Sequence, residues 1–405
     1  MKRYDSYKDS GVKWLGEIPS HWNTLPGLAV FSENKSKNTL LSYNTVLSLS
    51  YGKILVKKDI NEGLVPTDYN TYQIVHPGYI IIRCTDLQND KVSLRTGLVK
   101  NDGIITNAYL GLIVNKEYNY SYIYYFLHAW DVTKEIYRHG SGLRQSLSWL
   151  DLRRLPILLP SIEEQVSIAN YLNEATSKID SAIAQQQKMI DLLNERKQII
   201  INNAVTKGLD PNVKMKPSGV DWIGDIPEHW TVRKVKAFGD IKSGDGIKNS
   251  ELSDKGKYPV WGGNGLMGYT DRFNKKDNAI VIGRVGALCG NVRYLNSATF
   301  VTDNALILSL SKNIDHYYIL NALIAANLNA LNTSNAQPLI TGSKVKNVFI
   351  PYPPLDEQTM IVERMSTILE KLYKTLHSCQ QQISLLQERK QIIINDVVTG
   401  KVKVV

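Results

Sequence analysis

Two short segments carry residue types that could support metal-dependent nuclease chemistry. Glu195–Lys197 and Glu388–Lys390 both read Glu-Arg-Lys, and this order of a carboxylate and a lysine occurs in many nuclease active sites. Each segment lies within a stretch of helical periodicity, where oppositely charged side chains on neighbouring turns stabilise the helix. We therefore interpret both segments as charged faces of helices.

Other patterns that resemble ligand-binding motifs are incomplete. The glycine-rich segment Gly262–Gly268 has no Gly-Lys-Ser or Gly-Lys-Thr after it, so we interpret it as a turn and not as a phosphate loop. Ile350–Pro354 has the wrong residue order for an amino-group methyltransferase motif. The seven histidines form no His-Glu-x-x-His pattern, and the three cysteines form no Cys-x-x-Cys pair. We expect no catalytic site, no metal site and no cofactor bound by this chain.

The chain consists of two related halves. Three segments occur twice, at Ser10–Trp22 and Ser218–Trp230, at Leu159–Gln165 and Tyr352–Gln358, and at Glu195–Ile201 and Glu388–Ile394. We call the first pair, which reads SGVKWLGEIPSHW and SGVDWIGDIPEHW, the repeat segments. The copies of the second pair and those of the third pair are separated by the same number of residues. The difference in length between the halves therefore falls between the repeat segment and the segment that ends in Glu-Gln. A tandem duplication is the simplest explanation.

Each half ends in a predicted long helix of preserved length. Apolar residues follow one another in steps of three and four, as on one face of a helix. In the first half this stripe is Ile168, Leu172, Ala175, Ile179, Ala182, Met189 or Ile190, Leu193, Ile200 and Ala204. In the second half it is Ile361, Met365, Ile368, Leu372, Thr375, Ile383, Leu386, Ile393 and Val397. Prolines precede both helices, and Gly208 and Gly400 follow them as stop signals. One such helix cannot bury its stripe alone, so we expect an antiparallel pair.

Between repeat segment and long helix, each half is predicted to form a mixed α/β domain. Short apolar runs indicate strands, and one longer run in each half indicates a helix. The expected order of two strands, a helix and a closing strand is Tyr79–Thr85, Tyr109–Val114, Ser121–Trp130 and Leu155–Pro160 in the first half, and Ala279–Val285, Ala305–Leu310, Tyr317–Leu328 and Val348–Pro353 in the second. The two domains therefore share a scaffold and differ in most side chains.

Charge and polar loops favour a polyanionic partner. The net charge of +10 favours nucleic acid, because lysine and arginine release condensed counterions from phosphates. Polar loops at equivalent positions before each closing strand contain Arg144 with Gln145, and Gln337 with Lys344, which are side chains that can hydrogen-bond base edges or phosphates. The sequence contains neither a signal-peptide pattern nor a membrane-length apolar run, and we expect a cytoplasmic protein.

The repeat segments, the segments ending LPSIEEQ and YPPLDEQ, and the helices ending ERKQIIINNAVTKG and ERKQIIINDVVTGK together resemble the specificity subunits of type I restriction-modification systems. The resemblance covers essentially the whole chain. GNGLMGY, IGRVGALCGNV and TDNALIL in the second half are similar to phrases of that family's target-recognition domains, whereas the first half matches these phrases poorly.

This resemblance implies a non-catalytic subunit that reads double-stranded DNA. Two target-recognition domains would each read one half of a bipartite asymmetric site, and the helices would set the gap and dock two modification (methyltransferase) subunits. Those partners would hold S-adenosylmethionine and methylate adenine, and restriction (motor-nuclease) subunits would join them. The repeat segments would pack each domain against the base of the helix pair, with tryptophans in the core.

The predicted fold class is α+β (mixed α/β), with two target-recognition domains joined by two long antiparallel coiled-coil helices in a pseudo-two-fold tandem repeat. The predicted divisions are 1–160, 161–207, 208–354 and 355–405, which alternate recognition domain and spacer helix. Candidate DNA-binding residues are Arg83, Arg138, Arg144, Gln145, Arg284, Asn304, Gln337 and Lys344. Candidate spacer-helix and partner-subunit residues are Gln165, Leu172, Ile179, Leu193, Gln358, Met365, Leu372 and Leu386.

Two other classes of protein remain open at this point. The chain could be a coiled-coil assembly scaffold whose variable domains bind proteins, in which case the positive charge is incidental. It could also be a stand-alone enzyme. A steep dependence of DNA affinity on salt separates the first alternative from a DNA reader, and turnover of S-adenosylmethionine by this chain alone would identify the second.

Overall fold

The computed structural model describes residues 2–57, 69–90, 92, 94–142, 145–286, 288–311, 313–332 and 338–404. The chain divides into two compact units, which are Met1–Gln186 with Gln381–Val405 (unit 1) and Gln187–Gln380 (unit 2). The long helices α4 (Ile162–Lys207) and α7 (Leu355–Val398) both contribute to both units. Each unit therefore combines one sheet domain with a part of each long helix.

Unit 1 is built on a four-stranded antiparallel sheet in the order β4-β11-β8-β9. These strands are Phe31–Glu33, Leu110–Val114, Ile80–Ile82 and Thr96–Leu98. Four two-stranded sheets surround it, formed by β1 (Tyr7–Asp9) with β2 (Glu17–Pro19), β3 (Asn23–Pro26) with β12 (Pro156–Leu159), β5 (Leu47–Ser50) with β6 (Lys53–Val56), and β7 (Gln73–Val75) with β10 (Gly103–Ile105). The helices other than α4 and α7 are α1 (Gly27–Val30), α2 (Tyr120–Val132) and α3 (Trp149–Leu152).

Unit 2 has an equivalent four-stranded antiparallel sheet in the order β16-β22-β19-β20. These strands are Gly239–Ser243, Ala305–Leu310, Ala279–Gly283 and Val292–Leu295. The smaller sheets are β13 (Met215–Pro217) with β14 (Asp225–Pro227), β15 (Thr231–Lys234) with β23 (Phe349–Tyr352), and β17 (Tyr258–Gly262) between β18 (Gly265–Thr270) and β21 (Phe300–Val301). Its short helices are α5 (His316–Ala325) and α6 (Gly342–Lys346).

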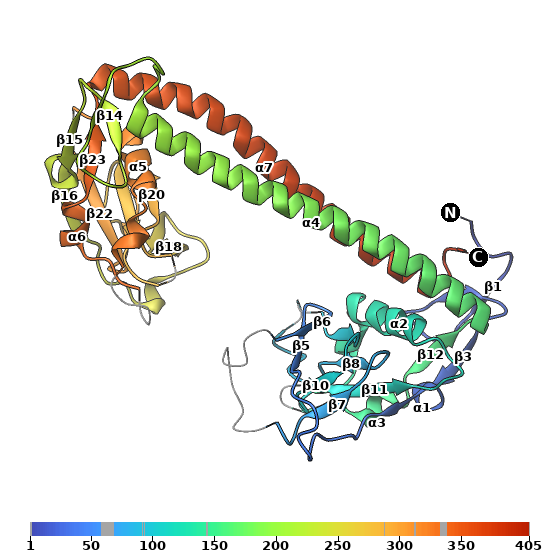
Figure 1. Ribbon diagram of the computed structural model, residues 1–405. Helices are drawn as coiled ribbons and strands as arrows, with labels where there is room; N and C mark the ends of the chain where they lie inside the picture. The colour runs from blue at the N-terminus through green and yellow to red at the C-terminus, as the bar shows by residue number, and fades with distance from the viewer. Residues whose placement is uncertain are drawn as a thin grey trace. The chain divides into compact units, whose positions relative to one another are not determined.

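Helix α2 of unit 1 lies between the central sheet and the long helices (Figure 1). Most of its side chains are buried, and Tyr122, Phe126 and Trp130 are at most 1% exposed. Asn119 caps its first turn by accepting a hydrogen bond from the amide of Tyr122. The corresponding helix of unit 2, α5, is capped in the same way by Asp315. A helix of this composition is stable only when buried, and here it joins the sheet to the long helices.

Within each unit the two long helices pack antiparallel, as the sequence predicts. In unit 1 the start of α4 and the end of α7 belong to one hydrophobic cluster, which contains Leu172 and Val397. In unit 2 the end of α4 packs against the first half of α7 through Ile201, Met365 and Leu369. In each unit, the apolar stripe that one long helix cannot bury alone is thus covered by the other long helix.

The predicted stripe is wrong in its detailed register. Ile368 is 40% exposed and Thr375 is also exposed, whereas Leu369 is buried. Ile190 is 7% exposed and Met189 is 48% exposed, which resolves that open alternative in favour of Ile190. Strict alternation of three and four residues has a period of 3.5, whereas an α-helix has 3.6 residues per turn, so the buried face drifts along a long helix.

Both long helices end at the predicted glycines. Gly208 and Gly400 have φ values of +73° and +76°, the left-handed conformation that glycine adopts without strain after a helix. A side chain at Gly400 would collide with Pro19, and one at Gly208 would come within 3.1 Å of the ring of Trp230. The end of each long helix therefore lies against a repeat segment.

Candidate nucleic-acid interface

The repeat segments fasten each sheet domain to the helix pair of its own unit. Trp22 is fully buried and its Nε1 donates to Glu164 in the first turn of α4, at 3.3 Å. Trp230 is also fully buried, and its Nε1 donates to Glu357 in the first turn of α7, at 2.9 Å. The histidine before each tryptophan contacts the same carboxylate. The interpretation of these tryptophans as core residues is confirmed.

Two tyrosines that the sequence analysis missed complete the attachment. The hydroxyl of Tyr122 donates to the carbonyl of Val398 at 3.5 Å and to a carbonyl of β12 at 2.9 Å. The hydroxyl of Tyr318 donates to the carbonyl of Val205 at 3.1 Å and to a carbonyl of β23 at 3.2 Å. Burial raises the pKa of both phenols well above the usual value, so they stay neutral donors. Each tyrosine ties its short helix to the end of a long helix.

Two of the predicted spacer-helix residues, Gln165 and Gln358, are used within their own units. Their side chains are at most 2% exposed. Gln165 accepts a hydrogen bond from the amide of Asn119 at 3.0 Å, and Gln358 accepts one from the amide of Asp315 at 3.1 Å. Each glutamine therefore joins the first turn of a long helix to the cap of a short one, and its side chain is not available to a partner subunit.

The other predicted spacer-helix residues lie in or beside the apolar stripe. Leu172, Ile179, Met365 and Leu372 are between 0% and 9% exposed. Leu193 and Leu386 are half-buried. The buried members of this set stabilise the helix pair, and contact of these residues with a partner subunit stays a prediction.

The predicted DNA-binding residues of unit 1 lie in two adjoining loops. Arg83 is about one-third exposed and its Nη1 lies 3.1 Å from Asp90. Arg138 is 62% exposed and lies 3.3 Å from Glu135. Gln145 points inward, because its Nε2 donates to the carbonyls of residues 137 and 139 at 2.7 and 2.9 Å. Arg144 lies outside the described residues.

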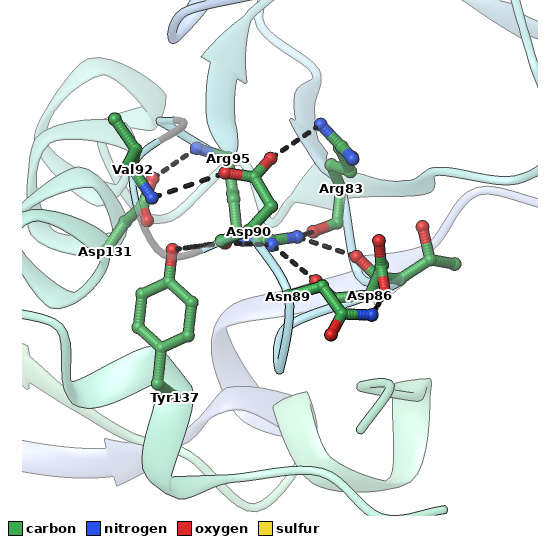
Figure 2. Close-up of polar contacts among 9 residues, drawn as sticks. Arg83, Asp86, Asn89, Asp90, Val92, Arg95, Asp131 and Tyr137 are labelled. Atoms are coloured by element: carbon green, nitrogen blue, oxygen red, sulfur yellow. Dashed lines mark hydrogen bonds and ion pairs between the residues drawn. The ribbon is translucent and has the colours of Figure 1, made fainter. Parts of the chain in front are cut away.

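A buried arginine outside the predicted set organises these loops. Figure 2 shows Arg95, which is fully buried, with its guanidinium donating to the carbonyls of Arg83, Thr85, Asp86 and Asp90 at 2.6 to 3.2 Å. The hydroxyl of Tyr137 accepts from its Nε and donates to the carbonyl of residue 90. A guanidinium stays charged and presents five donors in one plane. Arg95 therefore fixes the whole course of this loop.

Asp131 supports the same network from α2. Its Oδ2 accepts a hydrogen bond from the backbone amide of Arg95, and its Oδ1 is buried without a hydrogen-bond partner among the described residues. Burial raises the pKa of this carboxyl to about 6, against the lowering effect of the amide of Arg95 and the nearby charges. The carboxyl is thus close to half protonated under mildly acidic conditions.

In unit 2, Arg284 and Asn304 are joined through the backbone, and Lys344 lies in α6. The side chain of Arg284 is half-buried, its Nη1 donates to Ser243 at 3.4 Å, and its Nε is buried without a partner among the described residues. Asn304 is exposed, and its carbonyl accepts the amide of Arg284 at 3.0 Å. Lys344 donates through Nζ to the carbonyl of Leu331 at 2.9 Å. Gln337 lies outside the described residues.

Arg83 and Arg284 do not occupy equivalent positions. The carbonyl of Arg284 accepts the amide of Ile340, and the carbonyl of Cys84 accepts the amide of Leu147, both at 2.9 Å. The structural counterpart of Arg284 is therefore Cys84, which is 5% exposed and whose pKa burial raises to about 12. The two units present different side chains from the same scaffold position.

The glycines around Arg284 allow the backbone to pack closely there. A side chain at Gly263 would meet the carbonyl of Asn304 at 2.7 Å, and one at Gly283 would collide with the carbonyl of Gly263. The segment Gly262–Gly268 forms the turn between β17 and β18 and the start of β18, which confirms its interpretation as a turn. The loops thus allow close packing of backbone around the half-buried arginine.

Comparison with known proteins agrees with this arrangement. Residues 227–384 match the family model of the type I restriction modification DNA specificity domain. The chain is 28% identical over 277 residues to the type I restriction enzyme MjaVIII specificity subunit of Methanocaldococcus jannaschii, a match that covers 62% of this chain and 63% of that protein. It is 30% identical over 153 residues to the EcoprrI specificity subunit of Escherichia coli, covering 38% and 36% of the two chains.

A solved chain from work on complex assembly and conformational transition of the type I R-M system has a similar fold. Its TM-score is 0.66 at 15% identity, and the match covers 95% of this chain and 99% of that one. The chain thus shares with that protein a fold of sheet domains fastened to paired long helices. The chain is thus similar to type I restriction-modification specificity subunits, and residues 227–384 match that family's DNA specificity domain.

Proposed function

We propose that this chain is the DNA-reading specificity subunit of a type I restriction-modification complex. Each unit would read one half of a bipartite asymmetric site in double-stranded DNA, and partner subunits would methylate adenine or cut the DNA. The observation that carries the proposal is the placement of Arg284 beside the exposed Asn304, within the region that matches the DNA specificity domain. Guanidinium and carboxamide groups are the side chains that pair with the edges of guanine and adenine.

Two equivalent apolar surfaces on the long helices support the docking of two modification subunits. Leu192 and Ile199 of unit 2 are 51% and 53% exposed, and Leu385 and Ile392 of unit 1 are 63% and 51% exposed. Each pair is seven residues apart, so its members lie on one helix face. Because the two surfaces derive from the duplicated segment, they suit two copies of one partner. Restriction subunits would join this assembly.

We propose that catalysis and S-adenosylmethionine belong to those partners and that this chain is not an enzyme. Among the described residues there is no group of three histidine, cysteine or acidic side chains that could hold a metal ion. The described part also contains no helix that is long and apolar enough to span a membrane. The buried free thiols of Cys84, Cys289 and Cys379 support a place in the reducing cytoplasm.

The proposal is tested with the chain in complex with its modification subunits and a library of randomised double-stranded DNA. The intact complex should enrich a bipartite site, with an affinity that falls steeply as salt rises. Arg284→Ala should relax the preference at one position of one half-site by about 1–3 kcal/mol. Arg233→Ala is the matched control, because Arg233 is exposed on β15 next to the closing strand.

Enrichment of no site by the intact complex would contradict the proposal. If the recognition domains instead bound a protein with little dependence on salt, the chain would be an assembly scaffold. An unchanged site after Arg284→Ala would remove the observation that carries the proposal.

A further inference from the structure

The loop Arg83–Asp90 of unit 1 has its shape fixed from inside and its tip open to solvent. Arg95 holds the carbonyls at both ends of the loop, as Figure 2 shows. Leu87 is fully buried, and its amide donates to the carbonyl of Gln145 at 3.1 Å. A loop with a buried charged anchor and a buried apolar anchor loses little conformational entropy when it binds a ligand.

Two adjacent carboxamides stand at this tip. Gln88 and Asn89 are both exposed, directly after the buried Leu87. Asp86 adopts the left-handed conformation with φ of 61°, and its Oδ1 accepts a hydrogen bond from Nδ2 of Asn89 at 2.8 Å. The side chain of Asn89 is therefore oriented by the loop, and its carbonyl oxygen does not take part in that bond.

Gln145 in the neighbouring loop cannot supply the same chemistry. Both hydrogen bonds of its Nε2 go to backbone carbonyls within its own loop. The two loops are joined by the hydrogen bond from the amide of Leu147 to the carbonyl of Cys84, so a ligand that reaches the outer face of Gln145 also reaches the tip at Gln88. Gln88 and Asn89 are exposed carboxamides of the tip, whereas the amide nitrogen of Gln145 is used within its own loop.

We propose that Gln88 and Asn89 are the side chains with which unit 1 reads bases, and that they recognise adenine in the major groove. This inference rests on the proposed function and names the residues and the base for one half-site. A carboxamide donates to N7 and accepts from N6 of adenine at the same time, a pairing that no other base offers. Arg95 is the positioning residue, because it touches no base and sets the course of the loop.

The test uses the chain in complex with its modification subunits and a randomised double-stranded DNA library. Gln88→Ala and Asn89→Ala are measured beside Asn23→Ala, a control in which an exposed carboxamide is removed from β3, next to the start of α4. Each of the first two variants should lose its preference for adenine at one position of a single half-site, by roughly 5- to 150-fold. The other half-site should be unchanged in both, and the control should enrich the original site.

If the intact complex enriches a bipartite site that both variants also enrich without change, the inference is overturned and the proposed function stands. If the variants change a position that selects guanine or cytosine, the assignment to adenine is wrong. If the intact complex enriches no site, the proposed function fails and the inference fails with it. Because the substituted side chains are exposed, unfolding is not an expected cause of any loss.

Discussion

The attachment of each recognition domain to its helix pair predicts a measurable loss of stability when one hydroxyl is removed. Tyr122→Phe and Tyr318→Phe keep the buried ring and delete the oxygen. The oxygen of Tyr122 donates to carbonyls of β12 and Val398, and that of Tyr318 to carbonyls of β23 and Val205. Both side chains are fully buried, so water cannot replace the lost donor.

The size of the effect follows from the cost of leaving buried acceptors without a donor, which is about 1–3 kcal/mol. For a cooperative unit of roughly 150–250 residues, each kcal/mol lowers the unfolding temperature by about 2–4 °C. Each substitution should therefore lower the unfolding temperature of its own unit by about 2–12 °C. The unfolding transition of the other unit should move less.

Thermal unfolding followed by calorimetry measures this effect. Tyr120→Phe and Tyr317→Phe are matched controls, because they remove hydroxyls from tyrosines that are 50% and 47% exposed on the same short helices. The controls should stay within about 0.5 kcal/mol of the parent chain. If Tyr122→Phe and Tyr318→Phe unfold at the same temperature as these controls, the hydroxyls do not fasten the domains and the reasoning is refuted.

Three further predictions concern pH, the helix pair and the partner surfaces. Burial raises the pKa of Asp131 from 3.8 to about 6, so its contribution to stability is present below about pH 4 and is lost as pH rises through 6. In the parent chain, the unfolding free energy should fall by up to ~3 kcal/mol as pH rises from about 4 to 6, and in Asp131→Asn this fall should be absent. Denaturant titration of both chains at several pH values measures the difference. Asp180 and Lys390 lie 2.7 Å apart, and a double-mutant cycle with Asp180→Asn and Lys390→Gln should give a coupling of about 0.5–1 kcal/mol; a coupling of zero would contradict a stabilising contact. Leu192→Glu and Leu385→Glu should weaken association with the modification subunit in sedimentation experiments while unfolding free energies stay within about 0.5 kcal/mol, because both side chains are more than half exposed. Unaltered association would exclude these surfaces.

Periodicity and repetition were sufficient to predict the scaffold. The strand predicted at Ala305–Leu310 has those bounds in the structure, and the long helices end at the predicted glycines. The duplicated segments predicted the pairing of the two long helices, because the apolar stripe of each helix must pack against another apolar surface. The strand predicted at Tyr79–Thr85 ends at Ile82, because Arg95 draws the next carbonyls into its own hydrogen bonds.

The site was harder to predict, because its residue types do not reveal their surroundings. Gln145 has the chemistry of a base reader, yet its amide is used by backbone carbonyls of its own loop. Arg95 looks like any exposed cation in the sequence, and its burial depends on the folding of four carbonyls around it. No motif in the sequence marks Arg95, which stands between Leu94 and Thr96.

The central claim is that the two units read the two halves of one DNA site. Sequencing of methylated adenines in a host that produces this chain with its modification subunit tests the claim most directly, with the intact chain compared with one in which the loop Arg138–Trp149 is replaced. The account predicts a bipartite motif with a fixed gap, of which a single half is lost on replacement. The account is contradicted if this chain directs no methylation although the same modification subunit is active with another specificity subunit.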